Sequence, residues 1–531
     1  MTTRKGIIIF VLSLVVLFSS LTTSAQEPRF GGTLRVAIGT SLKSIDWMCY
    51  TQVIVRQVGY HIWETLVTFD DKFRIIGHLA HDWKISPDHK TYTFYLRKGV
   101  QFHKGYGEMK AEDVKSSIDR YIKKAPSGSA LNVNQVQVID DYTVALHLTK
   151  PSGPAFLSLL ALPSEAVIIF PKEIMDPLPD VNGIGLKEAV GTGPFELEDW
   201  IPGEKLVLSR FKDYSPPDFP AATGLGGKRV AYLDKVILIP TPEPSARVAA
   251  LEAGDVDFAD EVPATSYLSL KDNPGIKLYP VEPYFIPQAY FNMARGPFSK
   301  SIDLRKAVLA AVDTEQMLQA ATRGYKDFYK VACGSLFYQD IQPDLYSKYG
   351  CEQGLYGKGS EFEKARELMK KAGYNGEKIV IITNTDYYYM YASALVLADQ
   401  MGRAGFNTKL EVYDWPGELD RRSNLDAWDI AFSGNSIRMD PNMAYLWFYD
   451  KKKWTYFKEY KWPEMATLVE QDMAALTHEE RLAVWDKMMR LFIDNATMIN
   501  VGEVKTLYAS NNKVHFMNWY LWSFWNTWIE K

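Results

Sequence analysis

The sequence predicts an α/β protein of several domains, and three observations support this prediction. The chain has 531 residues, a length that suggests two to four domains. A β-branched strand at 378–383 precedes a helix at 391–403 and a second strand at 408–413. Strand, helix and strand in that order imply a parallel pair with a right-handed crossover. Residues 79–120 add a hairpin and then an amphipathic helix, which together form a smaller α+β unit.

The composition limits the classes of function. Hydrophobic residues make up 47% of the chain, enough for a sizeable core. Charged residues make up 23% and the net charge is −4, a near balance that argues against a nucleic-acid-binding protein with a basic face. Aromatic residues reach 13%. Such rings often line sugar or peptide clefts, although core packing accounts for most of them.

Residues 1–25 have the pattern of an export signal. Arg4 and Lys5 precede an apolar run at 7–18, and small residues lead up to Ala25, where we expect cleavage. An uncleaved membrane anchor is the alternative, but the run is short and its exit is polar. No cysteine lies near residue 25, so the new N-terminus offers no site for a lipid. Because no later segment is long and apolar enough to span a bilayer, we expect an exported, soluble protein.

Periodicity predicts the remaining elements. Tyr92, Phe94 and Leu96 alternate with polar neighbours, which is typical of a half-buried strand, and Val114 and Ile118 follow at helical spacing. Further strands are expected at 34–38, 236–239, 256–258 and 428–433, with alternation about a turn at 140–141 within 132–148. Helices are expected at 53–62, 246–253 and 361–372, helical structure from Asp303 through Leu318, and largely helical structure over 464–495. Glycines follow several of these helices directly, as C′ residues commonly do.

Five runs of residues carry a resemblance to one known family. They are GGTLRVA at 31–37, WETLV at 63–67, LAHDWKISPDHKTYTFYLRKGVQFHKG at 79–105 with AEDVKSSIDR at 111–120, RVAALEAGDVDFAD at 247–260 and IDLRKAVLAAVDTEQM at 302–317. In this order they closely resemble the family 5 extracellular solute-binding proteins, the peptide/nickel class that serves ABC importers. The chain departs from the family at Asp46-Trp47, where relatives usually have Asp-Pro.

The resemblance implies a periplasmic binding protein-like α/β fold of class II, or cluster C, with two lobes and three discontinuous domains. It places domain I at 26–61, 191–287 and 499–531, domain II at 62–190, and domain III at 288–498. Residues 279–291, rich in proline and aromatic rings, are interpreted as the linker into domain III.

The resemblance also implies a function. The protein would capture a peptide or peptide-like small solute in the periplasm and deliver it to ABC permease subunits in the inner membrane. It would act as a monomer without a cofactor, a bound metal or nucleic acid, and would catalyse no reaction. Two alternatives stay open: a secreted hydrolase, and a ligand-sensing protein coupled to a membrane receptor.

The cysteines and histidines were considered as sites of chemistry. Cys333 and Cys351 are expected to form a disulfide that closes a short loop, leaving Cys49 free; three free thiols are the alternative. The chain has no G-x-S-x-G or H-E-x-x-H motif and no C-x-x-C pair. Histidines gather between 61 and 103, and because some relatives bind nickel we considered a metal site there. Surface or turn positions explain these histidines better.

The stretch 428–441 is the most informative candidate for a ligand site. An expected strand at 428–433 is followed here by the loop 434–441. Ligands of parallel sheets bind beyond the carboxyl ends of the strands. Peptide-binding relatives have an acidic residue here that pairs with the ligand's α-amino group, whereas this chain has Arg438 near that position and Asp440 two residues later. An inward Arg438 would offer a bidentate fork to a carboxylate or a phosphate, and the ligand would then be an acid, such as an opine-like or other carboxylated solute. A solvated or internally paired arginine is the alternative.

The other candidates are side chains on loops that we expect at the edge of a ligand cleft. Each ring among them has core packing as its alternative role. They are Trp47, Tyr50, Asp386, Tyr387, Tyr388, Trp415 and Asn435.

Overall fold

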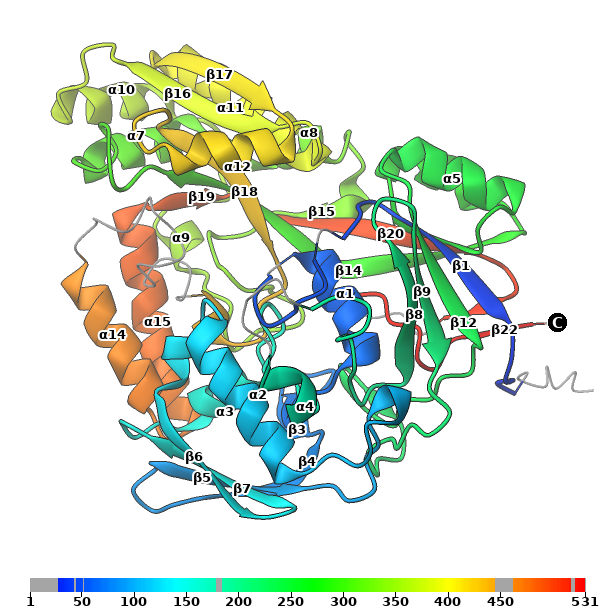
Figure 1. Ribbon diagram of the computed structural model, residues 1–531. Coiled ribbons are helices and arrows are strands. Elements are labelled where there is room, and N and C mark those ends of the chain that lie inside the picture. The colour runs from blue at the N-terminus through cyan, green and yellow to red at the C-terminus, as the bar shows by residue number, and fades with distance from the viewer. Residues whose placement is uncertain are drawn as a thin grey trace, which may run out of the picture.

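The computed structural model describes residues 27–42, 44–50, 52–177, 184–444, 462–516 and 521–530. The predicted export signal at 1–25 lies outside these residues. The described chain forms a two-lobed α/β structure, which confirms the predicted fold class (Figure 1). Within it, no helix combines the length and the apolar character that crossing a membrane requires.

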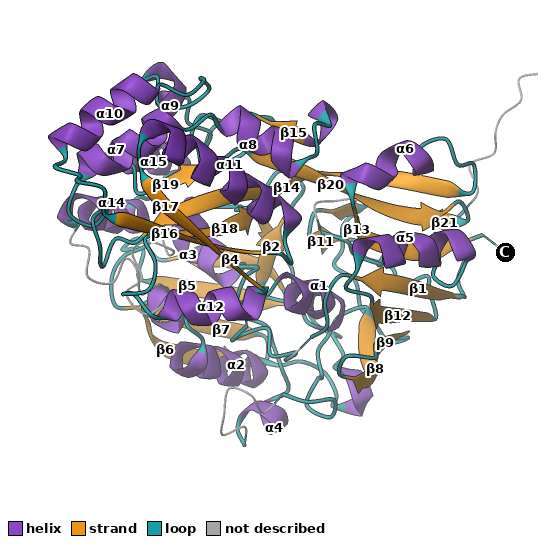
Figure 2. Cartoon of the chain, turned by 90° about the horizontal axis from the view of Figure 1, so that it is seen from above, coloured by secondary structure: helices purple, strands orange, loops and turns teal. Residues whose placement is uncertain are grey.

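One large sheet runs through both lobes, and its described part has twelve strands. Figure 2 shows it extending across the molecule from β17 to β8. In spatial order the strands are β17 (Asn407–Tyr413), β16 (Lys378–Asn384), β18 (Ile430–Ser436), β14 (Ile276–Phe291), β20 (Glu503–Asn511), β13 (Phe258–Val262), β1 (Thr33–Ile38), β12 (Lys235–Pro240), β9 (Lys205–Arg210) and β8 (Phe195–Ile201), with β15 (Tyr329–Lys330) on β20 and β19 (Met498–Asn500) on β14.

Strand β14 joins the two halves of this sheet. The sequence predicts a linker at 279–291, but these residues lie within a strand of 16 residues. Its first part pairs with β20 and its last part with β18, and the register with β20 shifts between Val281 and Phe285. Because proline cannot donate to a ladder, the prolines of this segment favour such an irregularity. The connection between the lobes is therefore hydrogen-bonded sheet.

The second lobe, for which we use the predicted bounds 288–498, is built on the parallel strands β16, β17 and β18. Both pairings of β16 are parallel, as the strand–helix–strand pattern predicts. The helix between β16 and β17 ends at Gly405, whose φ of 109° is readily adopted only by glycine. The helices of this lobe are α7 (Ile302–Ala311), α8 (Thr314–Ala321), α9 (Tyr349–Glu352), α10 (Phe362–Lys371), α11 (Tyr388–Ala404), α12 (Trp415–Ser423), α14 (Pro463–Ala474) and α15 (His478–Asn495).

The first lobe, which we define as the rest of the described chain, combines its half of the large sheet with a separate four-stranded sheet of order β4-β5-β7-β6. The predicted hairpin and helix at 79–120 are present as β4, β5 and α2. Its remaining elements are β2 (Val67–Phe69), β3 (Ile75–Gly77), β4 (Ala80–Ile85), β5 (Thr91–Leu96), β6 (Val133–Asp140), β7 (Thr143–Leu148), β10 (Ala222–Thr223), β11 (Gly226–Gly227), β21 (Val514–His515), β22 (Trp528–Ile529), α1 (Val53–Ile62), α2 (Ala111–Lys124), α3 (Pro154–Leu160), α4 (Lys172–Met175), α5 (Pro244–Ala253) and α6 (Tyr267–Leu270). The domain boundaries stay predictions.

The structure confirms one predicted stretch and corrects another. The largely helical stretch expected at 464–495 is present as α14 and α15, and Thr477 and Glu480 form a capping box that starts α15. The strand expected at 256–258 begins at Phe258 and runs to Val262. Its delay has a local cause: the amides of Asp255 and Val256 still donate to the Ala250 carbonyl and close helix α5.

A disulfide joins Cys333 and Cys351, with their Cα atoms 5.0 Å apart. It is the pairing expected from the sequence, and it closes an excursion of the second lobe. Cys49 is free and half-buried.

Candidate functional site

Polar side chains gather in the sheet where the lobes meet. Gln288 and Tyr290 lie two residues apart on β14, so they share one face, and Asn435 reaches them from β18. The Tyr290 hydroxyl donates to Gln288 Oε1 at 2.6 Å, and Asn435 Nδ2 donates to the same oxygen. Gln288 in turn donates to Asn500 of β19. All four residues are buried, and such a network is stable only because its groups are mutually bonded.

Asn435 is the first predicted site residue in this cluster, and its surroundings correct the prediction of a loop from 434. Strand β18 continues to Ser436, and Asn435 pairs with Ile286 across the ladder. The backbones pack so closely here that a Cβ on Gly434 would lie 1.9 Å from the Phe285 ring. Asn435 is therefore held rigidly.

Arg56 reaches the same region from the first lobe, and the sequence analysis missed it. It lies in α1, where Val53 alone is not buried, and it is 4% exposed. Its Nη2 donates to Ser436 Oγ at 2.6 Å. This bond joins residues 380 positions apart and links the two lobes. The signal in the sequence is a single charged residue inside the apolar run VIVRQVGYHI.

Arg438 is buried next to this cluster, and part of its guanidinium is bonded within the second lobe. Its Nη1 donates to the Met443 carbonyl, and its own carbonyl accepts from Gln342 at 2.5 Å. Arg438 and Arg56 both lie close enough to Tyr338 to lower the pKa of its hydroxyl, while burial raises that pKa well above its usual value. The charges of both arginines thus act on one buried hydroxyl, and the Glu503 carboxyl acts on it in the opposite sense.

Asp440 has a structural set of partners. Arg481 donates to its carboxylate from Nη1 at 2.6 Å and from Nη2 at 2.7 Å, and Ser158 Oγ donates to it at 2.8 Å. Arg481 also bonds Asp472. Because Ser158 lies on α3 of the first lobe, Asp440 forms a second polar link between the lobes.

Tyr387 and Trp415 form an aromatic cluster beyond the carboxyl ends of β16 and β17. Their rings meet edge to face with centroids 5.3 Å apart, and Asp386 accepts the Trp415 amide at 3.1 Å. Burial raises the pKa of Tyr387, and Glu261 of the first lobe adds to that shift. Tyr388 points elsewhere: it is 42% exposed, and Arg323 lies over its ring.

A buried carboxylate lies behind this aromatic cluster. Glu418 of α12 accepts from Asn384 Nδ2 at 2.6 Å and is fully buried. Burial raises the pKa of Glu418 to about 7, against the opposing effect of the Arg422 charge. No local pattern predicts this group, because its hydrogen-bond partner lies 34 positions away in the chain.

Trp47 lies in the core of the first lobe. It is 1% exposed, its Nε1 donates to the Pro163 carbonyl at 2.9 Å, and its ring meets Tyr60 edge to face at 4.6 Å. A Cβ on Gly59 would lie 2.5 Å from the Trp47 ring, so this helix position requires glycine. These contacts correct the placement of Trp47 at the edge of a cleft, because its ring and its N–H are both used in packing. Tyr50, three residues later, is half-buried.

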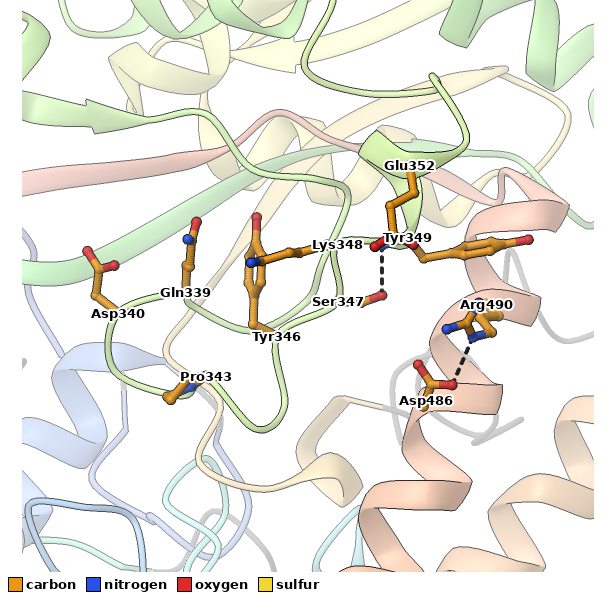
Figure 3. Close-up of a pocket in the computed structure, with 10 residues that line it drawn as sticks. All are labelled: Gln339, Asp340, Pro343, Tyr346, Ser347, Lys348, Tyr349, Glu352, Asp486 and Arg490. Atoms are coloured by element: carbon orange, nitrogen blue, oxygen red, sulfur yellow. Dashed lines mark hydrogen bonds and ion pairs between the residues drawn. The ribbon is translucent and has the colours of Figure 1, made fainter.

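A surface pocket of about 570 Å³ lies outside the contact between the lobes (Figure 3). Its lining comes entirely from the second lobe, between the disulfide-closed excursion and α15. Asp486 and Arg490 bond each other in its wall, and Arg490 also lies over the Tyr349 ring. The lining residues are Gln339, Asp340, Pro343, Tyr346, Ser347, Lys348, Tyr349, Glu352, Asp486 and Arg490.

His61, His78 and His103 are buried, which corrects the surface or turn positions expected for these histidines, whereas His81 is exposed. His61 Nε2 accepts the Phe524 amide, and His103 bonds Gly191 and Gly193. Burial lowers the pKa of His103 to about 4. Within the described ranges, no three His, Cys, Asp or Glu side chains are placed to hold a metal ion.

The fold and the polar cluster between the lobes define a two-lobed α/β solute-binding protein. Residues 74–457 match the bacterial extracellular solute-binding proteins, family 5 Middle, and the chain belongs to this family. This confirms the family predicted from the sequence: the protein is a substrate-binding protein of the ABC importer type.

Named relatives agree with this assignment. The chain is 28% identical over 489 residues to a probable peptide ABC transporter periplasmic-binding protein, y4tO, of Sinorhizobium fredii, covering 89% of this chain and 88% of that protein. Two solved structures are each 25% identical to this chain. The PBP AgaA of A. tumefaciens R10 in complex with agropinic acid has a TM-score of 0.79 and covers 94% of this chain and 99% of that one. DppA of Helicobacter pylori in complex with the peptide STSA has a TM-score of 0.78, with 95% and 99% covered.

Proposed function

We propose that the protein binds a small peptide-like or opine-like solute with a carboxylate between its two lobes in the periplasm, and delivers it to an ABC permease in the inner membrane. The observation that carries the proposal is the buried polar cluster at the lobe contact, formed by Gln288, Tyr290, Asn435 and Asn500 with Arg56 beside it. Binding sites for small polar solutes need such converging polar groups. The relatives named for peptides and for agropinic acid support this ligand class.

The contacts between the lobes suit a reversible closure. Arg56 bonds Ser436, and Ser158 bonds Asp440, through side chains alone. A solute that contacts both lobes favours the closed state by its differential affinity for that state. The aromatic cluster of Tyr387 and Trp415 offers apolar area for the middle of such a solute.

The test starts from the solute itself. The mature protein is purified from its native periplasm, and the bound compounds are released and identified by mass spectrometry. We expect a carboxylated solute of the peptide or opine class that rebinds with a Kd of about 1 μM, or about −8 kcal/mol. At 100 times Kd such a ligand stabilises the protein by about 2.7 kcal/mol, which raises its melting temperature.

A matched measurement tests closure and delivery. Small-angle scattering is recorded with and without the solute, and uptake of labelled solute is compared in cells with and without the gene. We expect a smaller radius of gyration with solute and loss of uptake without the gene. If no di- or tripeptide or opine raises the melting temperature and the scattering profile never changes, the proposal is wrong.

A further inference from the structure

Arg56 is a buried cation that lacks an anionic partner in the described part of the chain. Its side chain is 4% exposed, and its one hydrogen bond goes to the neutral hydroxyl of Ser436. Its Nε is buried and has no hydrogen-bond partner. An ionised group removed from water is stable only when it is paired or well bonded.

The other buried arginines of the described chain have carboxylate or carbonyl partners, or a carboxylate nearby. Arg438 bonds the Met443 carbonyl, and the charge of Arg422 acts on the Glu418 carboxyl. Three of the rest have carboxylate partners, and two are surrounded by backbone carbonyls. The paired ones are Arg120 with Asp46, Arg229 with Glu64, and Arg481 with Asp440 and Asp472; the carbonyl-bonded ones are Arg247 and Arg305. A buried Nε without a hydrogen-bond partner also occurs at Arg120, Arg229 and Arg438, so Arg56 differs in that its one hydrogen-bond partner in the described chain is a neutral hydroxyl.

A second polar group without a partner belongs to the same part of the second lobe as Ser436. The Tyr338 carbonyl accepts from the Gln342 amide at 3.0 Å, and Gln342 Nε2 donates to the Arg438 carbonyl, two residues after Ser436, at 2.5 Å. The Tyr338 hydroxyl is buried, 1% exposed, and has no hydrogen-bond partner. The charges of Arg56 and Arg438 both act on it, as does the carboxyl of Glu503. Glu503 is not the missing partner of Arg56, because the structure has no ion pair between them, and Glu503 Oε1 accepts from the Gln339 amide at 3.3 Å. Arg56 Nε and the Tyr338 hydroxyl are thus two unused donors in one buried region.

We propose that Arg56 and Tyr338 hold a carboxylate of the bound solute, and that this carboxylate is the counter-ion that α1 lacks. This inference rests on the proposed function and names the group of the solute that is recognised and the residues that recognise it. Two donors match the two oxygens of a carboxylate, and charge-assisted bonds of this kind are about twice as strong as neutral ones. Arg56 belongs to the first lobe and its partner Ser436 to the second. The carboxylate therefore binds at the contact between the lobes, where it favours the closed state.

The experiment compares Arg56→Met with the wild-type protein. The probes are free-acid di- and tripeptides, their C-terminal amides, and agropinic acid, all measured by isothermal titration calorimetry. We expect the wild type to prefer acids to their amides at least about tenfold, and Arg56→Met to lose that preference while its affinity for the amides changes little; one charged hydrogen bond is worth about 1.5–3 kcal/mol, or roughly 10- to 150-fold. Arg366→Met, at a surface arginine paired with Glu363, is the matched control and should bind like the wild type.

A second readout needs no ligand. If the counter-ion of Arg56 is an anion of the ligand, the ligand-free protein contains an uncompensated buried charge that Arg56→Met removes. Ligand-free Arg56→Met should then melt at or above the wild-type temperature. If Arg56 instead has a structural role, the variant melts lower. Equal affinity of Arg56→Met and wild type for an acid overturns this inference while leaving the proposed function intact. Failure of the wild type to bind any probe, together with a lower melting temperature of ligand-free Arg56→Met, overturns both.

Discussion

The imidazole of His103 should make the stability of the first lobe depend on pH. His103 is fully buried; the Gly191 amide donates to its Nδ1 at 3.2 Å, and its Nε2 lies 2.9 Å from the Gly193 carbonyl. The neutral ring therefore carries its proton on Nε2, and a second proton on Nδ1 would oppose the Gly191 N–H. Burial is the main cause that lowers the pKa of His103 to about 4, from an unfolded value of about 6.5.

The sign follows from the protons bound in each state. Between about pH 6.5 and 4 the unfolded chain binds the proton and the folded chain does not, so stability falls as the pH falls. At pH 5 the ratio of charged to neutral imidazole is roughly 30:1 in the unfolded chain, whereas the neutral form prevails by roughly 10:1 in the folded chain. This difference lowers the free energy of unfolding by about 2 kcal/mol. The full effect, reached below pH 4, is about 3.4 kcal/mol.

The assay compares His103→Gln with the wild type, because carboxyls such as Glu418 and Glu503, with pKa values raised to about 7, act in the opposite direction in both proteins. Guanidinium denaturation is followed by tryptophan fluorescence at pH 7 and pH 5. His103→Gln should be less stable at pH 7, and its deficit should shrink by about 2 kcal/mol at pH 5. Phe211→Leu, which loosens the ring packed edge-on against His103, is the control whose deficit should not change with pH. A His103→Gln deficit that is equal at both values refutes the reasoning.

Three further predictions concern other buried groups. Asp440→Ala should lower the free energy of unfolding by about 3 kcal/mol, because it breaks a buried pair with Arg481; an unchanged melting temperature in calorimetry would contradict this. Replacing Cys333 and Cys351 together by serine should cost about 3 kcal/mol, since the bond closes a loop over a sequence separation of 18; equal denaturation midpoints in matched guanidinium titrations would argue against it. Burial raises the pKa of Cys49 to about 12, so iodoacetamide at pH 8 should modify it far more slowly in the folded protein than in urea, as mass spectrometry would detect; equal rates would refute its burial.

Local patterns predicted much of the fold because they depend on neighbours a few residues apart. The hairpin at 80–96 and the parallel strands at 378–413 follow from alternation and from helix-ending glycines such as Gly405. Boundaries were less certain where a local hydrogen bond decided them. The capping box at Thr477 separates α14 from α15 within the predicted helical stretch, and the ladder with Ile286 keeps Asn435 inside its strand.

The site was only partly predictable, because its chemistry depends on which segments meet. Arg438 and Asp440 were found from the loop after β18, yet Met443 and Arg481 occupy part of their hydrogen-bonding capacity within the second lobe. Trp47 was predicted to lie at the edge of a cleft because it belongs to a loop. Gly59 of α1 leaves room for its ring, which is buried in the core.

Arg56 illustrates the opposite error. An arginine inside an apolar helix reads as a tolerated exception to the pattern, since arginine commonly extends its charge to water along a flexible stem. Whether it does so depends on what covers the helix, and here strand β18, 380 positions away, covers it with a serine. The covering strand belongs to the other lobe, so in the proposed closure the charge loses its water. A cation desolvated by closure opposes closure until an anion joins it, and this gives a carboxylated solute a direct physical means of favouring the closed state.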